Sequence, residues 1–202
     1  SLDDMPTYIA YNLLTILCCA AIFPLTLTKA TQPVTPTAMR LRPMIAWRAS
    51  PLAVAGVLVA ALSSAAFRMV GPIYGQEVGL AASQIGYFLA AFVAGGAVAQ
   101  YPVGWLADKY DRRWVLIGLS IAAIIACMIT VASATMGTFA VMAAATLFGL
   151  TTFPVYSVAT AHAHDFVSSE DRVELSAALM FFYAVGAIAA PYTSSSLIAW
   201  YG

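Results

Sequence analysis

Residues 114–133 read WVLIGLSIAAIIACMITVAS, a run without a single charged side chain. A helix of about 20 apolar residues is long enough to cross the hydrocarbon core of a bilayer, which is roughly 30 Å thick. This stretch therefore predicts a transmembrane helix. Similar apolar runs occur at residues 7–28, 51–75, 82–103, 137–160 and 173–199. The whole pattern predicts an all-α, polytopic membrane protein with about six transmembrane helices.

The composition agrees with this fold class. Hydrophobic residues make up 62% of the 202 residues and charged residues 9%, whereas an average soluble domain has roughly 45–50% and about 25%. The formal net charge is zero, so no basic excess points to a nucleic-acid partner. Cys18, Cys19 and Cys127 lie within apolar runs without metal-ligand spacing. They are expected to act as small hydrophobic residues.

The basic residues predict the orientation of the helices. If successive helices alternate in direction, residues 28–50, 104–113 and 161–172 lie on the same side of the membrane. Every Lys and Arg except Arg68 falls in these three segments. By the positive-inside rule, the three segments are expected to face the cytoplasm.

The longest of these loops, residues 29–50, separates the first predicted helix from the other five. Residues 40–48 (RLRPMIAWR) alternate basic and apolar side chains. This pattern fits an ordinary basic linker, which is the simpler interpretation, or a short amphipathic stretch at the anionic inner leaflet. We expect a boundary between two helix bundles here.

The sequence GWLADKYDRR, which begins at Gly104, joins two predicted helices. Asp108 follows the end of the first helix, where the helix dipole disfavours an acid by about 0.3–1 kcal/mol. It therefore needs a partner. Lys109, Arg112 or Arg113 could provide one locally. The positive N-terminus of a neighbouring helix could also do so, because Gly104 lacks a side chain and permits a close approach.

Asp111 has a different expected role. It directly precedes the next apolar run, so we expect it to cap the N-terminus of that helix. On these grounds alone the loop could equally be a capped turn whose positive charges only set the orientation.

The same loop resembles the signature loop of the major facilitator superfamily. That pattern joins the second and third helices of each half. It consists of Gly, any three residues, Asp, a basic residue, any two residues and a pair of basic residues. Asp111 stands where the pattern usually has Gly. The resemblance implies a conformational switch formed by Gly104, Asp108, Lys109, Arg112 and Arg113.

A second stretch supports the resemblance. Residues 153–156 (FPVY) and 161–165 (AHAHD) resemble the tenth helix and following loop of bacterial permeases in this superfamily, with His164 in place of the usual Asn. His162, Asp165 and Glu174 are expected to make contacts at this loop. Histidines two residues apart diverge on a helix and no third ligand is evident, so no metal site is predicted.

The last apolar run resembles the Gly-rich, Pro-containing helix found at the equivalent place in each half of these proteins. From spacing alone, it and the third run carry stripes of small residues at every fourth position, which allow helices to pack closely. The stripes are Gly186, Ala190 and Ser194, and Ala91, Gly95 and Ala99. We expect packing to be their main role.

Polar side chains inside the predicted spans are candidates for a substrate cavity. Arg68 is the only basic residue within a span, and intramembrane charges often serve function. The alternatives are that Arg68 snorkels outward or pairs with Glu77 near the outer mouth. Weaker candidates for the cavity are Asn12, Gln100, Tyr101, Tyr156 and Tyr183.

The resemblance implies a place for each part of the chain. Residues 1–28 would be the last helix of a preceding N-terminal half, residues 29–50 the cytoplasmic loop between the halves, and residues 51–202 five helices of the C-terminal half. The partners would be the rest of the same protein, the lipid bilayer and a small solute, without a cofactor or a metal.

The implied function is secondary active transport by alternating access across a bacterial inner membrane. Proton coupling is one option, and Glu174 is a conceivable carrier, although its place in the first turn of a helix is explained more simply by the dipole. The competing hypothesis is a non-transporting sensor or assembly module that retains the fold. An enzyme is not favoured, because no convergent nucleophile and base are visible within a span.

Overall fold

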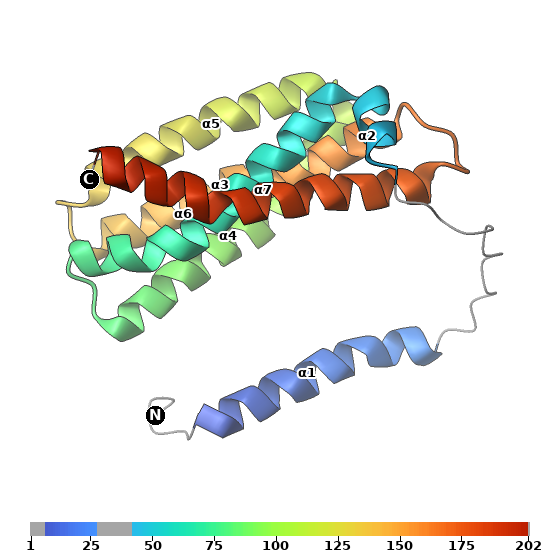
Figure 1. The fold of residues 1–202 in the computed structure, drawn as a ribbon. Helices are drawn as coiled ribbons and strands as arrows, with labels where there is room; N and C mark the ends of the chain where they lie inside the picture. Colours follow the sequence, from blue (N-terminus) through green and yellow to red (C-terminus); the bar gives the residue numbers. More distant parts are fainter. Residues whose placement is uncertain (1–6, 28–41, 202) are drawn as a thin grey trace. The chain divides into compact units, whose positions relative to one another are not determined.

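The computed structural model describes residues 7–27 and 42–201, and these fold almost entirely into α-helices (Figure 1). The chain divides into two compact units, Ser1–Met39 and Arg40–Gly202. The first unit contains α1 (Thr7–Leu27). The second contains α2 (Pro43–Ala49), α3 (Pro51–Glu77), α4 (Ala82–Lys109), α5 (Arg112–Ser133), α6 (Thr138–His164) and α7 (Arg172–Tyr201). Most of the predicted inter-half loop, residues 28–41, lies outside the described residues.

The helices confirm five of the six predicted spans. Within the described residues, α3 to α7 are each long and apolar enough to cross a membrane, and α1 contains a shorter apolar stretch, Tyr11–Pro24. Most helices extend beyond the predicted apolar runs. The largest extension is that of α4, which continues through Pro102 to Lys109, because polar and charged residues can complete a helix where it leaves the apolar region.

Local capping explains where two of the helices begin. Ser50 caps α3 by accepting a hydrogen bond from the Ala53 N–H at 3.2 Å. Asp111 caps α5 by accepting a hydrogen bond from the Arg113 N–H at 2.9 Å, which confirms the role predicted for it. The α4–α5 connection is therefore only two residues long, and it holds the two helices in adjacent positions at this end.

Small residues bring α4 and α6 into backbone contact. A Cβ atom at Gly95 would lie 2.1 Å from the Thr146 carbonyl oxygen, and one at Gly149 would lie 1.9 Å from the Phe92 carbonyl oxygen. Ala99 is also buried. The predicted packing role of this stripe is confirmed.

The α7 stripe has the same function against α3. A Cβ atom at Gly186 would lie 2.8 Å from the Leu58 carbonyl oxygen, and Ala190 is fully buried. Thus α3 packs on α7 and α4 packs on α6, while α3 and α5 also contact α6. The four helices α3, α4, α6 and α7 form the centre of the second unit, which positions the pocket described below.

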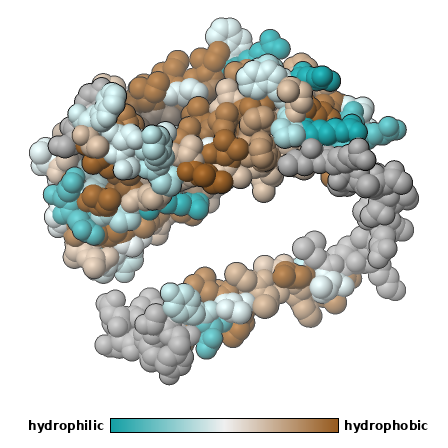
Figure 2. Space-filling view, viewed as in Figure 1, coloured by the Kyte–Doolittle hydropathy of each residue, from teal (hydrophilic) through white to brown (hydrophobic). Residues whose placement is uncertain are grey.

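The second unit has an apolar surface. Large side chains such as Met128, Val131, Phe139 and Ile188 are more than two-thirds exposed. In Figure 2 the visible face of this unit is largely brown along its middle, and teal side chains gather toward its ends. A soluble monomer rarely exposes apolar surface on this scale, whereas a bilayer covers it. The chain is an integral membrane protein.

Residues 43–49, part of the predicted linker, form helix α2. Pro43 starts the helix, Ala46 is fully buried, and Met44 and Trp47 are about half exposed. The described end of the linker is thus a short helix with one buried face that packs against α7.

Candidate functional site

A pocket of about 230 Å³ lies where α3, α4, α6 and α7 meet. Four of the six cavity candidates from the sequence line it: Arg68, Gln100, Tyr156 and Tyr183. Tyr101 does not line it and is 85% exposed, and Asn12 belongs to α1 of the first unit. The other lining residues are Ala60, Ser64, Thr152, Phe153, Ser157 and Met180. Four separate helices thus each contribute one of the predicted polar side chains to a single cavity.

The pocket lies near the middle of the helices. At a rise of 1.5 Å per residue, each of the four candidate residues lies within roughly 8 Å of the midpoint of its helix. Arg68 lies on the later half of α3, and Tyr183 lies just before the midpoint of α7. The polar pocket is therefore at the depth where an unpaired polar group is most costly in a bilayer.

Hydrogen bonds and ring contacts join the walls of the pocket. The Ser157 hydroxyl donates to Gln100 Oε1 at 3.0 Å, and the Tyr156 hydroxyl lies 3.3 Å from Met180 Sδ. The Tyr156 and Tyr183 rings meet edge to face, with centroids 5.2 Å apart. The bond from Ser157 occupies the oxygen of the Gln100 amide, so the amide nitrogen stays available as a donor.

The ion pair with Glu77, which was one of the alternatives for Arg68, does not form. Both residues are described, and the structure forms no salt bridge between them, whereas Arg68 lines the pocket. A separation of nine residues turns a helix by about 900°, which places the two side chains on opposite faces. Arg68 and Glu77 both lie toward the same end of α3, which suggested the pair, but their side chains point in opposite directions around the helix axis.

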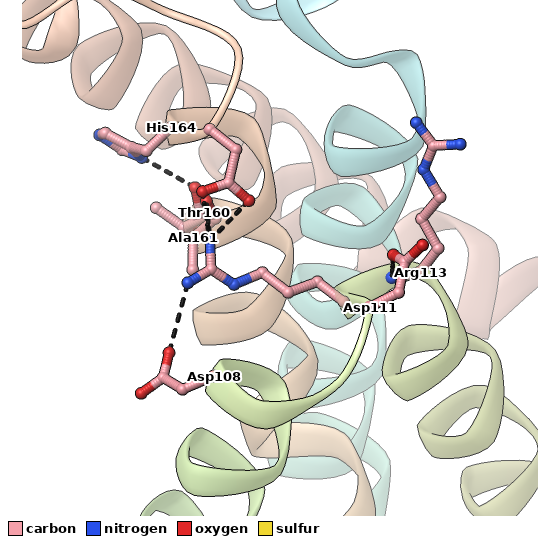
Figure 3. A network of polar contacts seen from close by, with 8 residues as sticks. Asp108, Asp111, Arg113, Thr160, Ala161 and His164 are labelled. Atoms are coloured by element: carbon pink, nitrogen blue, oxygen red, sulfur yellow. Dashed lines mark hydrogen bonds and ion pairs between the residues drawn. The ribbon is translucent and has the colours of Figure 1, made fainter.

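A second cluster of polar residues lies at the end of the unit formed by residues 42–51, 108–113 and 161–172, which we call the basic end. Its centre is Arg112, the first residue of α5. Arg112 Nη1 donates to both carboxylate oxygens of Asp165, at 2.5 and 2.6 Å, and to the Ala161 carbonyl at 3.0 Å. Arg112 Nη2 donates to Asp108 at 3.3 Å. Figure 3 shows these contacts reaching from α5 to α4 and α6.

The position of the two acids explains this arrangement. Asp108 is next to the last residue of α4, and Asp165 caps the C-terminus of α6. Both carboxylates lie at the negative ends of helix dipoles, where an acid is unfavourable. Arg112 compensates both charges and also satisfies one of the last carbonyls of α6, which has no partner within its own helix. The partner that Asp108 was expected to need is therefore Arg112.

The remaining residues of the predicted switch have other contacts. The Lys109 ammonium lies 4.8 Å from the centre of the Trp105 ring and 5.9 Å from that of Tyr110, and it forms no ion pair with Asp108. The side chain of Arg113 points away from the network in Figure 3. A Cβ atom at Gly104 would meet no described atom within 4 Å. The close approach expected at Gly104 is thus not made by any described helix of the second unit.

The predicted loop-contact residues His162, Asp165 and Glu174 also lie at the basic end, and Asp165 is the partner of Arg112 described above. His162 is buried, and its ring meets Phe166 edge to face at 5.0 Å. His164 Nδ1 is 2.8 Å from the Thr160 carbonyl and its Nε2 is 3.1 Å from Ser176 Oγ. Glu174 lies 3.7 Å from Arg42, the residue that precedes α2.

The network borders a surface pocket of about 470 Å³, which Asp108, Asp111, Arg113 and His162 help to line. This pocket is separate from the one between α3, α4, α6 and α7. The structure therefore has one polar cavity at mid-depth and one charged recess at an end.

Comparison with known proteins identifies the family. The family model of the Major Facilitator Superfamily matches residues 52–202. The chain belongs to the major facilitator superfamily. The match covers α3 to α7, the helices that build both the central pocket and the charged network.

Bacterial relatives in this superfamily (MFS) extend the similarity toward the N-terminus. An MFS-type transporter of Enterobacter sp. (strain 638) is 30% identical over 181 residues, which cover 89% of this chain and 46% of the relative. The MFS-type transporter YcaD of Escherichia fergusonii is 30% identical over 190 residues, covering 93% and 48%. One from Yersinia enterocolitica is 28% identical over 156 residues, covering 77% and 40%. The chain spans about half the length of these relatives, and no solved structure matches it significantly.

Sequence reasoning missed several residues of both sites. Ser157, which orients Gln100, and Met180, which contacts Tyr156, were not singled out. Each lies on the same helix as a predicted candidate, Ser157 next to Tyr156 and Met180 one turn before Tyr183. The pairing of Arg112 with Asp165 was also missed, although both residues were candidates. The available signal was that Arg112 and Asp165 have opposite charges and lie in two loops predicted to be on the same side of the membrane.

Proposed function

We propose that this chain is part of a secondary active transporter, which moves a small solute across a bacterial inner membrane by alternating access. The pocket between α3, α4, α6 and α7 forms part of the solute site. One observation carries the proposal: four helices each bring a polar candidate side chain to one cavity near the middle of the membrane-spanning unit. Such groups are costly in a bilayer and typically mark a transport pathway.

The proposal assigns a role to each segment. Residues 1–28 form the last helix of a preceding half, residues 29–50 connect the halves on the cytoplasmic side, and residues 51–202 supply five helices of the C-terminal half. The basic end then faces the cytoplasm, as its Lys and Arg residues favour. In this superfamily two halves rock about a central site. Both halves are therefore needed for the activity, and proton coupling remains one of its options.

The test is whether the pocket opens to both sides of the membrane. In the cysteine-free full-length protein, Ser157→Cys places one thiol on an exposed position of the pocket wall. Right-side-out and inside-out vesicles are treated with a membrane-impermeant maleimide, and the rate of labelling is measured. Alternating access predicts labelling from both sides, because the same site faces each solution in turn.

Two control positions report the orientation in the same experiment. Ser169→Cys lies in the exposed α6–α7 loop at the basic end, and Thr135→Cys lies in the α5–α6 loop at the other end. Ser169→Cys should react only in inside-out vesicles and Thr135→Cys only in right-side-out vesicles. One-sided labelling of Ser157→Cys would favour the sensor or assembly module instead, and exchanged labelling of the two controls would reverse the proposed orientation.

A further inference from the structure

The pocket between α3, α4, α6 and α7 has an unbalanced charge. Among its lining residues, all of which are described, Arg68 is the only one that is charged. Arg68 forms no ion pair with any described residue, and Glu77 lies on the opposite face of α3. A guanidinium at this depth is expensive unless an anion accompanies it. The pocket therefore favours a negatively charged occupant.

The hydrogen bonds inside the pocket also favour a negatively charged occupant. The Gln100 carbonyl oxygen already accepts from Ser157 at 3.0 Å, which leaves the amide N–H groups of Gln100 for an occupant. The Thr152 hydroxyl donates to the Phe148 carbonyl at 2.7 Å, so its proton is also committed inside the protein. The hydroxyls of Ser64 and Tyr183 can donate or accept, whereas Arg68 and the Gln100 amide nitrogen can only donate. Donors suit a ligand that presents acceptor oxygens.

Apart from a few hydroxyl groups, the rest of the wall is apolar and largely aromatic. The rings of Phe153, Tyr156 and Tyr183 line the pocket together with Met180, and the two tyrosine rings meet edge to face. Aromatic faces and edges pack well against another flat ring. A fully hydrated inorganic anion would leave this surface unused, whereas an organic anion with an aromatic body would cover it.

We infer that the pocket binds a small aromatic carboxylate. The planar Arg68 guanidinium matches the two oxygens of a carboxylate, the Gln100 amide donates to one of them, and the aromatic wall contacts the body of the ligand. This inference rests on the proposed function, because it takes the pocket to be the solute site.

The test compares ligands of equal shape and different charge. The probes are benzoate, phenylacetate and cinnamate, each paired with its neutral amide, and benzamidine as a cation of the same shape as benzoate. Binding to the full-length protein in lipid nanodiscs is measured as the concentration dependence of its thermal unfolding midpoint. At least one carboxylate should bind tenfold or more tightly than its amide, and benzamidine should bind weakest.

Variants assign the preference to Arg68. Arg68→Gln should remove the carboxylate preference, and Arg68→Lys should keep part of it, because the charge remains but the planar fork is lost. Arg172→Gln, which removes an exposed arginine at the basic end, is the matched control and should bind as the unmodified protein does. The carboxylate-to-amide ratio is read within each variant, so a general loss of stability does not imitate the result.

Equal binding of every carboxylate and its amide, a preference for benzamidine, or a preference unchanged in Arg68→Gln would each overturn the inference. These outcomes are distinct from failure of the proposed function. If Ser157→Cys is labelled from both sides and no carboxylate is preferred, the transporter stands and the anion assignment falls. If labelling is one-sided, the transport function itself falls.

Discussion

Arg112 shows how a single side chain can connect three helices. Its side chain is 22% exposed, whereas those of Asp165 and Asp108 are 51% and 76% exposed. Exposed ion pairs contribute little, about 0–1 kcal/mol, so the 3.3 Å contact with Asp108 is the weak arm of the network. The two bonds to Asp165 and the bond to the Ala161 carbonyl are the strong arm. Arg112 is mostly shielded from solvent there, and the guanidinium, the Asp165 carboxylate and the Ala161 carbonyl all gain hydrogen-bond partners.

Truncation of Arg112 should therefore cost more stability than neutralisation of Asp108. Arg112→Ala removes every contact of the network and leaves two acids at helix C-termini, so we expect a loss of about 1.5–3 kcal/mol, the range for hydrogen bonds to charged groups. Asp108→Asn should cost less than about 1 kcal/mol. Thermal unfolding of the purified full-length protein gives the order of the two effects.

Arg113→Ala is the control for this comparison, because Arg113 carries the same charge one residue later but points away from the network (Figure 3). It should unfold near the temperature of the unmodified protein. Equal destabilisation by Arg112→Ala and Arg113→Ala would show that the total charge of the loop matters and that the individual contacts do not.

The residue scale also shows what the sequence could predict. The cap at Asp111 was predictable, because an N-cap depends on residues two or three positions away. The bond between Arg112 and Asp165 depends on how α5 packs against α6, which local sequence does not specify. Lys109 and Arg113 were expected to be interchangeable with Arg112 as partners of Asp108. The structure separates the three side chains by direction, a property that spacing alone did not reveal.

At the scale of elements, close helix packing depends on glycine at a few positions. Gly149 of α6 lies so near the backbone of α4 that a Cβ atom would be 1.9 Å from the Phe92 carbonyl oxygen. A bilayer provides no hydrophobic force that favours helix association, so such close contact is a main source of attraction between helices. Substitution must separate α4 from α6 or distort one of them.

Gly149→Ala should therefore destabilise the protein although alanine favours helices. Overpacking typically costs about 1–3 kcal/mol, and here the obstacle is backbone, which cannot rotate away. Gly118→Ala is the matched control, because a Cβ atom at Gly118 of α5 meets nothing within 4 Å. The measurement is the fraction of monodisperse protein after solubilisation, together with the unfolding midpoint. If both variants behave alike, the α4–α6 contact is looser than the structure indicates.

The elements themselves were largely predictable, because a bilayer imposes a minimum length on an apolar helix. Hydropathy located the spans, and spacing located the small-residue stripes. Hydropathy does not report a helix that continues past the apolar region, as α4 does to Lys109, or one too short to span, such as α2. It also does not report the angle around a helix. For this reason hydropathy placed Arg68 within a span but could not tell whether its side chain faces Glu77.

At the scale of the whole molecule, the charged network has a proposed role in conformational change. The resemblance of the 104–113 loop to the superfamily's signature loop implies that Asp108 contacts the other half when the cytoplasmic side is closed. The structure leaves room for such a contact, since the Asp108 side chain is 76% exposed and Arg112 holds only one of its oxygens, at 3.3 Å. Gly104 likewise faces open space within the described residues.

If these contacts form only in the closed state, they favour the outward-open conformation by a coupling of about 1–3 kcal/mol, the usual range between sites. Asp108→Asn should then shift the population toward inward-open. In inside-out vesicles, the thiol of Ser157→Cys should react several-fold faster with the impermeant maleimide when Asp108→Asn is also present.

A purely structural role for the loop predicts a different pair of results. Asp108 would then serve only the turn between α4 and α5, and its neutralisation would change the amount of folded protein without changing the accessibility of the pocket. The expressed amount and the labelling rate must therefore be measured in the same samples, with Ser169→Cys as a thiol whose exposure does not depend on the conformation of the pocket. Faster labelling of Ser157→Cys at an unchanged rate for Ser169→Cys would support the switch. An unchanged rate at both positions, with less protein, would leave Asp108 as a turn residue, since a latch that does not alter access to the pocket cannot bias the transport cycle.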